Sequence, residues 1–533
     1  MEPLLPILIG LLAVVALVAL IAPRLRVPAP ALLALGGVLL GLVPGLPLLK
    51  LDPELILLGF LPPLLYSDAF RASWTDFRRW LRPILMLAVG LVAATTLLVG
   101  FVLHALLPEL PLPACFLLGA IVSPTDTVAV QAVIERLRIP RRMTAVLGGE
   151  ALVNDATGLF GVQLFIAALA GGTFGARSLA LDFVWIGGGG VLAGVVIGGL
   201  GVLANRRARG TELLFVLSLL APYLAFLTAH AAHSSGVVAV VVAGFIVSWR
   251  IQDIPPSSRV ALYTTWELMT SVLNAFCFVL IGVETPGLLR DSHAASGMQG
   301  LLVAGGAVAL TVIVVRIVWT FPGAYVPLLL MPRLRKKEGG FPNWRAVTVV
   351  SWCGIRGVIS LAAALSVPEM IGSEPFPGRE IILSCTLSVI LITLFLQAPT
   401  LHLLIGWLGL SDEDTTENEV RKAREAVLKA GIEKLDEFCS ETSCPLSVHH
   451  WRTQMMDELL SMKASDKEER ERARGRHEVS QEVHRAVAAA HAAELLRLRD
   501  KGELNDVTYM DLLLELDREN PEYLQATANA HGG

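Results

Sequence analysis

Stretches of about 20 mostly apolar residues follow one another from the N-terminus to about residue 410. A helix of that length spans the hydrocarbon core of a bilayer and satisfies its own backbone hydrogen bonds. The chain has 54% hydrophobic and 17% charged residues, whereas about a quarter of the residues of soluble proteins are charged. We therefore predict an all-α polytopic membrane protein. About thirteen transmembrane helices are expected, near 4–22, 28–48, 53–70, 83–107, 112–134, 144–170, 180–204, 212–231, 235–250, 262–286, 298–330, 345–368 and 380–408.

The charge balance changes sign near Leu410. Residues 1–410 contain 26 Lys and Arg against 20 Asp and Glu, whereas residues 411–533 contain 17 against 27. A break of this kind in composition and charge indicates a domain boundary. We predict a transmembrane domain over 1–410 and a charged, helical cytoplasmic tail over 411–533.

The basic residues of the connections predict the orientation. One set of alternate connections contains 20 Lys and Arg, and the opposite set contains four. Basic connections stay on the cytoplasmic side of the membrane. We therefore expect a multi-pass protein of the cell (inner or plasma) membrane, with its N-terminus outside and its tail inside. The lipid bilayer is the expected partner, and no nucleic-acid partner is expected.

The segment GAIVSPTDTVAV (119–130) contains a proline and a carboxylate inside an apolar stretch. Pro124 lacks an N–H group and clashes with the carbonyl of Ala120, so the helix should break in mid-membrane. Non-helical backbone at that depth occurs only where it is buried in protein or lines a water-filled cavity. The hydroxyls of Ser123 and Thr125 and the carboxylate of Asp126 are hard oxygen ligands for a small cation. The alternative is a proline kink whose carbonyls are capped by serine and threonine.

The next predicted span contains Glu150, Asn154 and Asp155. At about 100° per residue, Glu150 and Asn154 share one helix face, and Asp155 is rotated away from Glu150 by roughly 140°. A carboxylate at mid-bilayer usually faces a cavity or pairs with a cation. We interpret Asp155 as the group that faces a cavity and Glu150 as the partner of a buried arginine. The alternative is that these carboxylates serve only in structural pairs.

Two arginines lie inside late spans, Arg316 and Arg356. Gly354 and Gly357 flank the Ile355–Arg356 pair, which permits close helix approach or a local break. A buried guanidinium needs a carboxylate, and removal of one partner from a buried pair costs about 3–5 kcal/mol. The interrupted fifth and twelfth spans further predict an inverted repeat, spans 1–6 against spans 8–13, with the interrupted helices crossed at the midplane.

Several motifs resemble those of one transporter family. These motifs are LPPLLYSDAF (61–70), GAIVSPTDTVAV (119–130), GGEALVND (148–155), SSGVVAVVVAGFIV (234–247), FVLIGV (278–283) and GIRGVISLAAAL (354–365). On these motifs, the chain is similar over about residues 5–410 to the monovalent cation:proton antiporters of the NhaP/NHE type, the sodium/proton exchanger family, in its bacterial form with a cytoplasmic tail.

The resemblance implies a homodimer in which each chain has a two-domain fold of thirteen helices in inverted repeats. It implies that Asp155 binds the cation and the transported proton in turn, that Asp126 and Asn154 shape the site, and that Glu150 forms a structural ion pair with Arg356. Many relatives have an acidic residue at the position of Ser67, where this chain has the acid one position later, at Asp68. A serine that coordinates the cation in some relatives is replaced by Ala151.

The expected function is secondary active antiport of a monovalent cation, Na⁺ before Li⁺ or K⁺, against H⁺ in pH homeostasis. Because Asn154 stands where a second carboxylate could lie, we predict electroneutral exchange. No cofactor and no metal other than the transported cation are expected. The alternatives are a cation channel and an intramembrane aspartyl protease that uses Asp126 and Asp155. Neither aspartate lies in a GxGD motif, and the chain contains no HExxH or Walker motif, so an enzyme is not expected.

Overall fold

The computed structural model describes residues 4–22, 24, 28–43, 53–126, 130–131, 139–171, 176–208, 210–296, 298–338, 340–371, 373–410, 413–441 and 446–463, with a few isolated residues beyond. Chain contacts divide it into two compact units, Met1–Asp412 and Glu413–Gly533. In the second unit, α20 (Glu413–Glu441) and α21 (Leu446–Lys463) pack through Leu428, Ile432 and Leu459.

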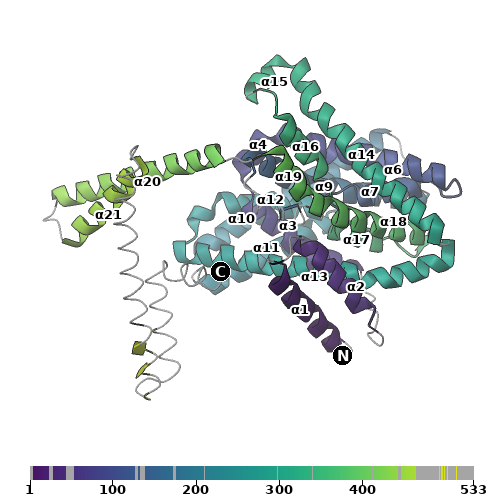
Figure 1. Ribbon diagram of the computed structural model, residues 1–533, viewed down its shortest axis with the longest axis horizontal. Coiled ribbons are helices and arrows are strands. Elements are labelled where there is room, and N and C mark those ends of the chain that lie inside the picture. Colours follow the sequence, from purple (N-terminus) through teal and green to yellow (C-terminus); the bar gives the residue numbers. More distant parts are fainter. Residues whose placement is uncertain are drawn as a thin grey trace. The chain divides into compact units, whose positions relative to one another are not determined.

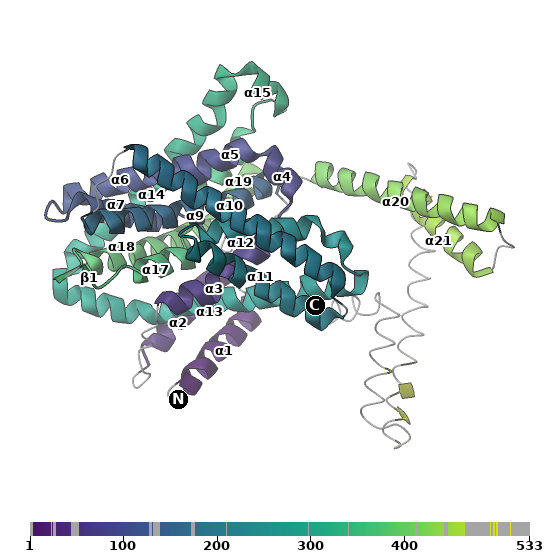
Figure 2. The ribbon, with the colours of Figure 1, turned by 180° about the vertical axis from the view of Figure 1, so that it is seen from behind.

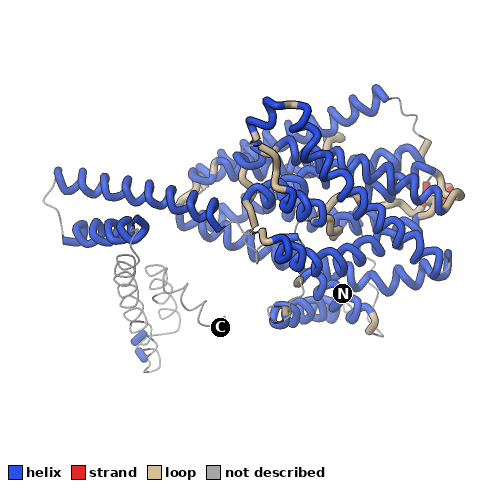
Figure 3. The backbone as a smooth tube through the Cα atoms, turned by 45° about the horizontal axis from the view of Figure 1, so that its top comes forward, coloured by secondary structure: helices blue, strands red, loops and turns tan. Residues whose placement is uncertain are grey.

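The first unit is almost entirely helical (Figure 1, Figure 3). Its first half contains α1 (Leu4–Ile21), α2 (Ala29–Gly41), α3 (Pro53–Arg71), α4 (Trp74–Arg79), α5 (Leu81–Leu85), the π-helix η1 (Met86–Leu91), α6 (Val92–Leu106), α7 (Leu112–Val122), α9 (Arg141–Leu169) and α10 (Ala176–Arg207). Its second half contains α11 (Thr211–Ala231), α12 (Gly236–Trp249), the short helix η2 (Ile251–Asp253), α13 (Pro256–Ser296), α14 (Met298–Leu330), α15 (Pro332–Lys337), α16 (Trp344–Trp352), α17 (Val358–Leu365), strands β1 (Met370–Ile371) and β2 (Glu374–Pro375), α18 (Arg379–Ile392), the π-helix η3 (Thr393–Gln397) and α19 (Ala398–Leu408).

Each predicted span coincides with a described helix or an interrupted helix. Within the described residues, seven helices are long and apolar enough to cross a membrane, and shorter apolar helices include α2, α7 and α12. Span 345–368 divides into α16 and α17, as the glycines around Arg356 indicated. Span 112–134 is described as α7 and the residues up to Asp126, and most of the remainder lies outside the described residues. The all-α membrane fold is therefore confirmed.

The packing follows the predicted repeat. The contact of α1 with α2 recurs as α11 with α12, that of α3 with α12 recurs as α13 with α2, and that of α7 with α9 recurs as α17 with α18. Each element corresponds to the one seven spans later. An odd offset reverses the direction in which a helix crosses the membrane, so the two halves are inverted with respect to each other.

Two of the apolar clusters belong to different bundles of helices. One core lies among α6, α7, α14, α17 and α18, and the other among α3, α11, α12 and the first half of α13. Figures 1 and 2 show α6, α7 and α18 at one side of the first unit, and α10, α11 and α12 at the other. A third apolar cluster joins the two bundles, because it contains Phe278 and Ile281 of α13 together with Ile390 of α18.

Small residues allow α2 and α13 to pack with their backbones in contact. A Cβ on Gly37 would overlap the carbonyl oxygen of Val279, and a Cβ on Gly282 would overlap that of Ala34. Without a hydrophobic driving force between helices in lipid, such close van der Waals packing is a main source of association. The pair therefore depends on glycine at its crossing point.

Gly37→Ala is expected to destabilise the membrane unit by about 1–3 kcal/mol, because the added methyl overpacks this crossing. Gly199→Ala in α10 is the matched control, since its Cβ would meet no atom within 4 Å. The melting temperature of the purified protein in detergent measures both changes. An equal melting temperature for the two variants would contradict the tight α2–α13 contact.

Candidate functional site

The first interrupted helix ends where the sequence predicts it. Helix α7 ends at Val122, and residues 123–126 are not helical. The Ser123 hydroxyl donates a hydrogen bond of 2.9 Å to the Ala120 carbonyl, which Pro124 leaves without its helical partner. Ser123 is therefore a cap of the broken helix and does not line the cavity described below. That position does not support the prediction of Ser123 as a cation ligand.

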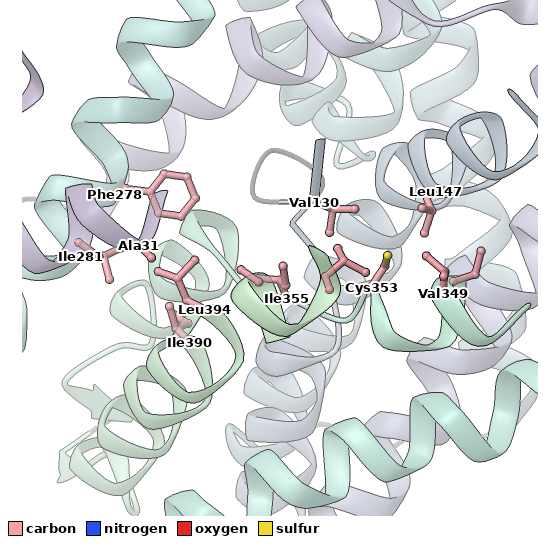
Figure 4. Packing of buried hydrophobic residues seen from close by; sticks show 14 of the residues in the cluster. Ala31, Val130, Leu147, Phe278, Ile281, Val349, Cys353, Ile355, Ile390 and Leu394 are labelled. Atoms are coloured by element: carbon pink, nitrogen blue, oxygen red, sulfur yellow. The ribbon is translucent and has the colours of Figure 1, made fainter. Parts of the chain in front are cut away.

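The second interruption crosses the first. Residues 353–357 separate α16 from α17, and the Asp126 N–H donates a hydrogen bond of 2.8 Å to the Ile355 carbonyl. In return, Arg356 Nε donates at 2.6 Å to the carbonyl of Val122. Figure 4 shows Ile355 between the two groups of buried apolar side chains that surround this crossing. Each broken helix thus satisfies one freed carbonyl of the other.

Gly357 makes room for the carboxylate of Asp126. A Cβ at position 357 would overlap Asp126 Oδ2. Sequence reasoning predicted close helix approach at this glycine but did not identify what approaches it. Gly357 itself indicated a close approach. Its partner, Asp126, lies more than 200 positions away in the sequence, and only the tertiary structure brings the two residues together.

The buried ion pair differs from the predicted one. Arg316 Nη1 and Nη2 donate to Glu150 Oε1 and Oε2 at 2.5 and 2.9 Å, and both residues are fully buried. Arg356 instead donates to the carbonyls of Val122 and Gly354 and forms no ion pair with any residue that the structure describes. The prediction of a Glu150–Arg356 pair is therefore wrong. The broken helices supply Arg356 with free carbonyls, while the stem of Arg316 passes Gly354 and reaches Glu150 from α14.

A relay of hydrogen bonds connects this ion pair to the first interruption. The Thr125 hydroxyl donates to Glu150 Oε1 at 3.2 Å and accepts from Asn154 Nδ2 at 2.8 Å. Glu150 and Asn154 contact one hydroxyl because they lie one turn apart on α9, as their spacing predicted. Arg316 thereby orients Glu150, which orients Thr125 and Asn154.

A cavity of about 480 Å³ lies beside this relay. Its lining includes Asp155, Asp126 and Thr125 from the interrupted region and α9, and Asp68 from α3. Asp155 is only 4% exposed, and no described protein group donates a hydrogen bond to its Oδ1. Glu150 and Asn154 do not line the cavity. Asp155 thus lies at the cavity wall and Glu150 in an ion pair away from the cavity, which is the arrangement that their spacing predicted.

Ser67 and Asp68 occupy different environments. Ser67 is fully buried, whereas Asp68 lines the cavity and accepts a hydrogen bond of 3.4 Å from Arg71 Nη2. The acidic residue of this chain therefore reaches the cavity although it lies one position later than in many relatives. Ala151 also lines the cavity and offers no side-chain oxygen to it.

The geometry permits reversible binding of a small cation. At the crossing, the cavity is lined by the carboxylates of Asp126 and Asp155 and the hydroxyl of Thr125, which are hard oxygen donors, next to a backbone that is held by buried hydrogen bonds. Hard monovalent and divalent cations prefer such oxygen ligands.

Comparisons with known proteins agree with this geometry. A family model described as "Sodium/hydrogen exchanger, transmembrane" matches residues 10–407. The chain is 33% identical over 530 residues to an uncharacterized Na⁺/H⁺ exchanger of Mycobacterium tuberculosis, covering 98% of this chain and 96% of the relative. It is 30% identical over 437 residues to a sodium, potassium, lithium and rubidium/H⁺ antiporter of Bacillus pumilus, covering 79% of this chain and 64% of the relative.

A solved structure has the same fold. The sodium proton antiporter MjNhaP1 from Methanocaldococcus jannaschii matches with a TM-score of 0.60 at 21% identity. The match covers 76% of this chain and 99% of the MjNhaP1 chain.

Double-mutant cycles test which of the two arginines pairs with Glu150. Glu150→Gln and Arg316→Met are each expected to destabilise the protein by about 3–5 kcal/mol, because each leaves a buried charge unpaired. Their double variant should be less destabilised than the sum, with a coupling of at least about 1 kcal/mol. The same cycle with Arg356→Met should give a smaller coupling. Unfolding in detergent measures both cycles, and a larger coupling with Arg356 would contradict the observed pairing.

Proposed function

This chain belongs to the sodium/hydrogen exchanger family, and we propose that it exchanges Na⁺ for H⁺ at Asp155 by alternating access. Li⁺ and K⁺ are further candidate cations, since a relative is named for several alkali cations. The cavity between the two bundles, with Asp155 at its wall, is the observation that carries this proposal.

One carboxylate accounts for the coupling. Buried Asp155 Oδ1 has no hydrogen-bond donor among the described residues, and an ionised carboxylate without a partner is costly in this environment. A proton removes the charge, and a cation at contact distance compensates it. Since both cannot do so at once, binding of one releases the other.

The neighbouring residues have distinct proposed roles. Asp126 and Thr125 line the cavity and are the proposed oxygen ligands beside Asp155. Asn154 holds the Thr125 hydroxyl from outside the cavity, so we assign it a positioning role. Asp68 is the proposed carboxylate of the ion path. Arg71 competes with the cation for this carboxylate, because it pairs with Asp68 at 3.4 Å.

The cavity has one open side. Its lining continues to Arg71, Asp76 and Thr144, next to connections that are rich in arginine. We assign this side to the cytoplasm because basic connections remain there, which places the N-terminus outside and the tail inside.

We infer that the other side of the site is closed. Beyond the crossing, Leu361 and Leu365 of α17 face α13 across a gap of about 10 Å³, which Glu284 also lines. A space of roughly this volume holds at most one water molecule. Movement of the bundle that contains the crossed helices against α3 and α13 would open this gap and close the cavity, which is the alternating access that exchange requires.

The alternatives fit less well. A channel needs a path that is open on both sides, whereas the gap between α13 and α17 beyond the crossing has a volume of only about 10 Å³. A protease needs two aspartates that act on a peptide, whereas the matching family and relatives are exchangers, so we infer that the chain is not an enzyme. We further propose a homodimer in the cell membrane, which rests on the family resemblance.

Asp155→Asn is expected to abolish sodium-driven proton movement while the protein keeps its melting temperature, since asparagine has the same shape but does not exchange a proton. Glu109→Gln, an exposed carboxyl neutralisation, is the control and should exchange at the rate of the unmodified protein. Exchange is measured by a pH-sensitive dye in proteoliposomes with an imposed Na⁺ gradient. Retained sodium-driven proton movement in Asp155→Asn would contradict the assignment of Asp155 as the exchange group.

Exchange should be electroneutral, one Na⁺ for one H⁺, because the residue before Asp155 in the chain, Asn154, does not titrate. In proteoliposomes, collapse of the membrane potential with valinomycin and K⁺ is expected to leave the initial rate unchanged. A voltage that scaled with Na⁺ flux would disprove this stoichiometry.

A further inference from the structure

The lipid-facing surface of α14 continues into an exposed basic segment. Leu310, Val314 and Val318 are exposed along α14, and exposure continues through Leu329, Leu330 and Met331 at its end. The next residues form α15 and return to α16. We name residues 329–338 and 340–344 the basic hairpin.

The basic hairpin combines exposed apolar and cationic side chains. Its exposed large apolar residues are Leu329, Leu330, Met331, Phe341 and Trp344, and Leu330 is 74% exposed. Arg333, Arg335 and Lys336 are also exposed and form no ion pair with any residue in the described part of the chain. Unpaired cations beside exposed apolar and aromatic groups are typical of segments that lie at a membrane interface.

The hairpin has a defined shape. The Tyr325 hydroxyl donates to the Pro342 carbonyl at 3.1 Å, and the guanidinium of Arg335 lies 5.3 Å from the centre of the Phe341 ring. The Gly340 N–H closes the turn on the carbonyl of Arg335 at 2.9 Å. Figure 1 shows α15 projecting from the remainder of the bundle. The cations are therefore presented on an ordered element.

We propose that the basic hairpin binds the headgroups of anionic phospholipids in the leaflet that it faces. The apolar residues continue the lipid-facing side of α14, so the hairpin enters the interface where the headgroups lie. Near such a surface, each Lys or Arg contributes about 1 kcal/mol of attraction. The three cations supply the charge complementarity, and the leaflet supplies the apolar contact that a soluble anion lacks.

Glu338 connects the hairpin to the helix that bears Asp155. Its carboxylate accepts hydrogen bonds from Arg82 Nε and Nη2 at 2.6 and 2.9 Å and lies 3.5 Å from Arg142 Nη2. Arg142 is in the first turn of α9, and the Glu338 side chain is only 6% exposed. Lipid bound to the hairpin therefore restrains α9 at one end. If the proposed exchange occurs, its rate will depend on the anionic lipid content.

The test compares full-length protein with two triple variants of equal charge change. The hairpin variant is Arg333→Gln/Arg335→Gln/Lys336→Gln. The control is Arg24→Gln/Arg207→Gln/Arg250→Gln, which removes three exposed arginines from other basic connections. The melting temperature is measured in detergent with added phosphatidylglycerol or phosphatidylcholine, and Na⁺/H⁺ exchange is measured in liposomes of the same two lipids.

Phosphatidylglycerol is expected to raise the melting temperature of the unmodified and control proteins, and the hairpin variant should lose at least half of that rise. The ratio of exchange rates in the two lipids should approach one in the hairpin variant alone. A full rise in the hairpin variant, or an equal loss in the control, overturns the proposal.

The acidic tail is the other candidate occupant of the hairpin. If the tail docks on the hairpin, the hairpin variant should melt at a lower temperature without added lipid, and phosphatidylglycerol should not raise the melting temperature of the unmodified protein. This result also overturns the proposal. Absence of exchange in all three proteins, with the melting pattern as expected, would refute the proposed exchange and leave the lipid site supported.

Discussion

The structure depends on two broken helices that satisfy each other's backbone hydrogen-bonding groups inside an apolar environment. An unpaired backbone group in hydrocarbon costs several kcal/mol, and Pro124 and the 353–357 segment free several such groups. The hydrogen bonds from Asp126 N–H to Ile355 and from Arg356 Nε to Val122 satisfy them across the crossing. The two interruptions are therefore stable only together, and the halves of the chain must meet at this point.

The proposed ion-binding residues lie at the same crossing. Asp126 lies against Gly357, and Thr125 is held between Glu150 and Asn154. The Arg316–Glu150 pair does not face the cavity, yet it orients the residues that do. A buried pair is a poor source of net stability because desolvation offsets attraction. Its value here is positional, since a rigid relay keeps the oxygen ligands in place while the bundle moves.

The proposed movement takes place at a boundary between apolar clusters. One cluster lies on each side of the site. A third cluster, which includes Phe278 of α13 and Ile390 of α18, crosses the boundary, so the movement must exchange contacts of these side chains. The cavity on one side of the site and the narrow gap on the other correspond to one end of the proposed movement.

The sequence by itself determined the span pattern, the break at Pro124, the break around Arg356 and the different faces of Glu150 and Asp155. Each of these follows from local physics, namely the length of apolar runs, the missing N–H of proline and the 100° step of a helix. Only the tertiary structure decided that Arg316 pairs with Glu150, that Ser123 caps α7 and that Asp68 rather than Ser67 reaches the cavity. Those outcomes depend on which distant segments lie side by side. In the sequence, Arg316 and Arg356 are equally plausible partners of Glu150, and only the packing places one guanidinium within reach of the carboxylate.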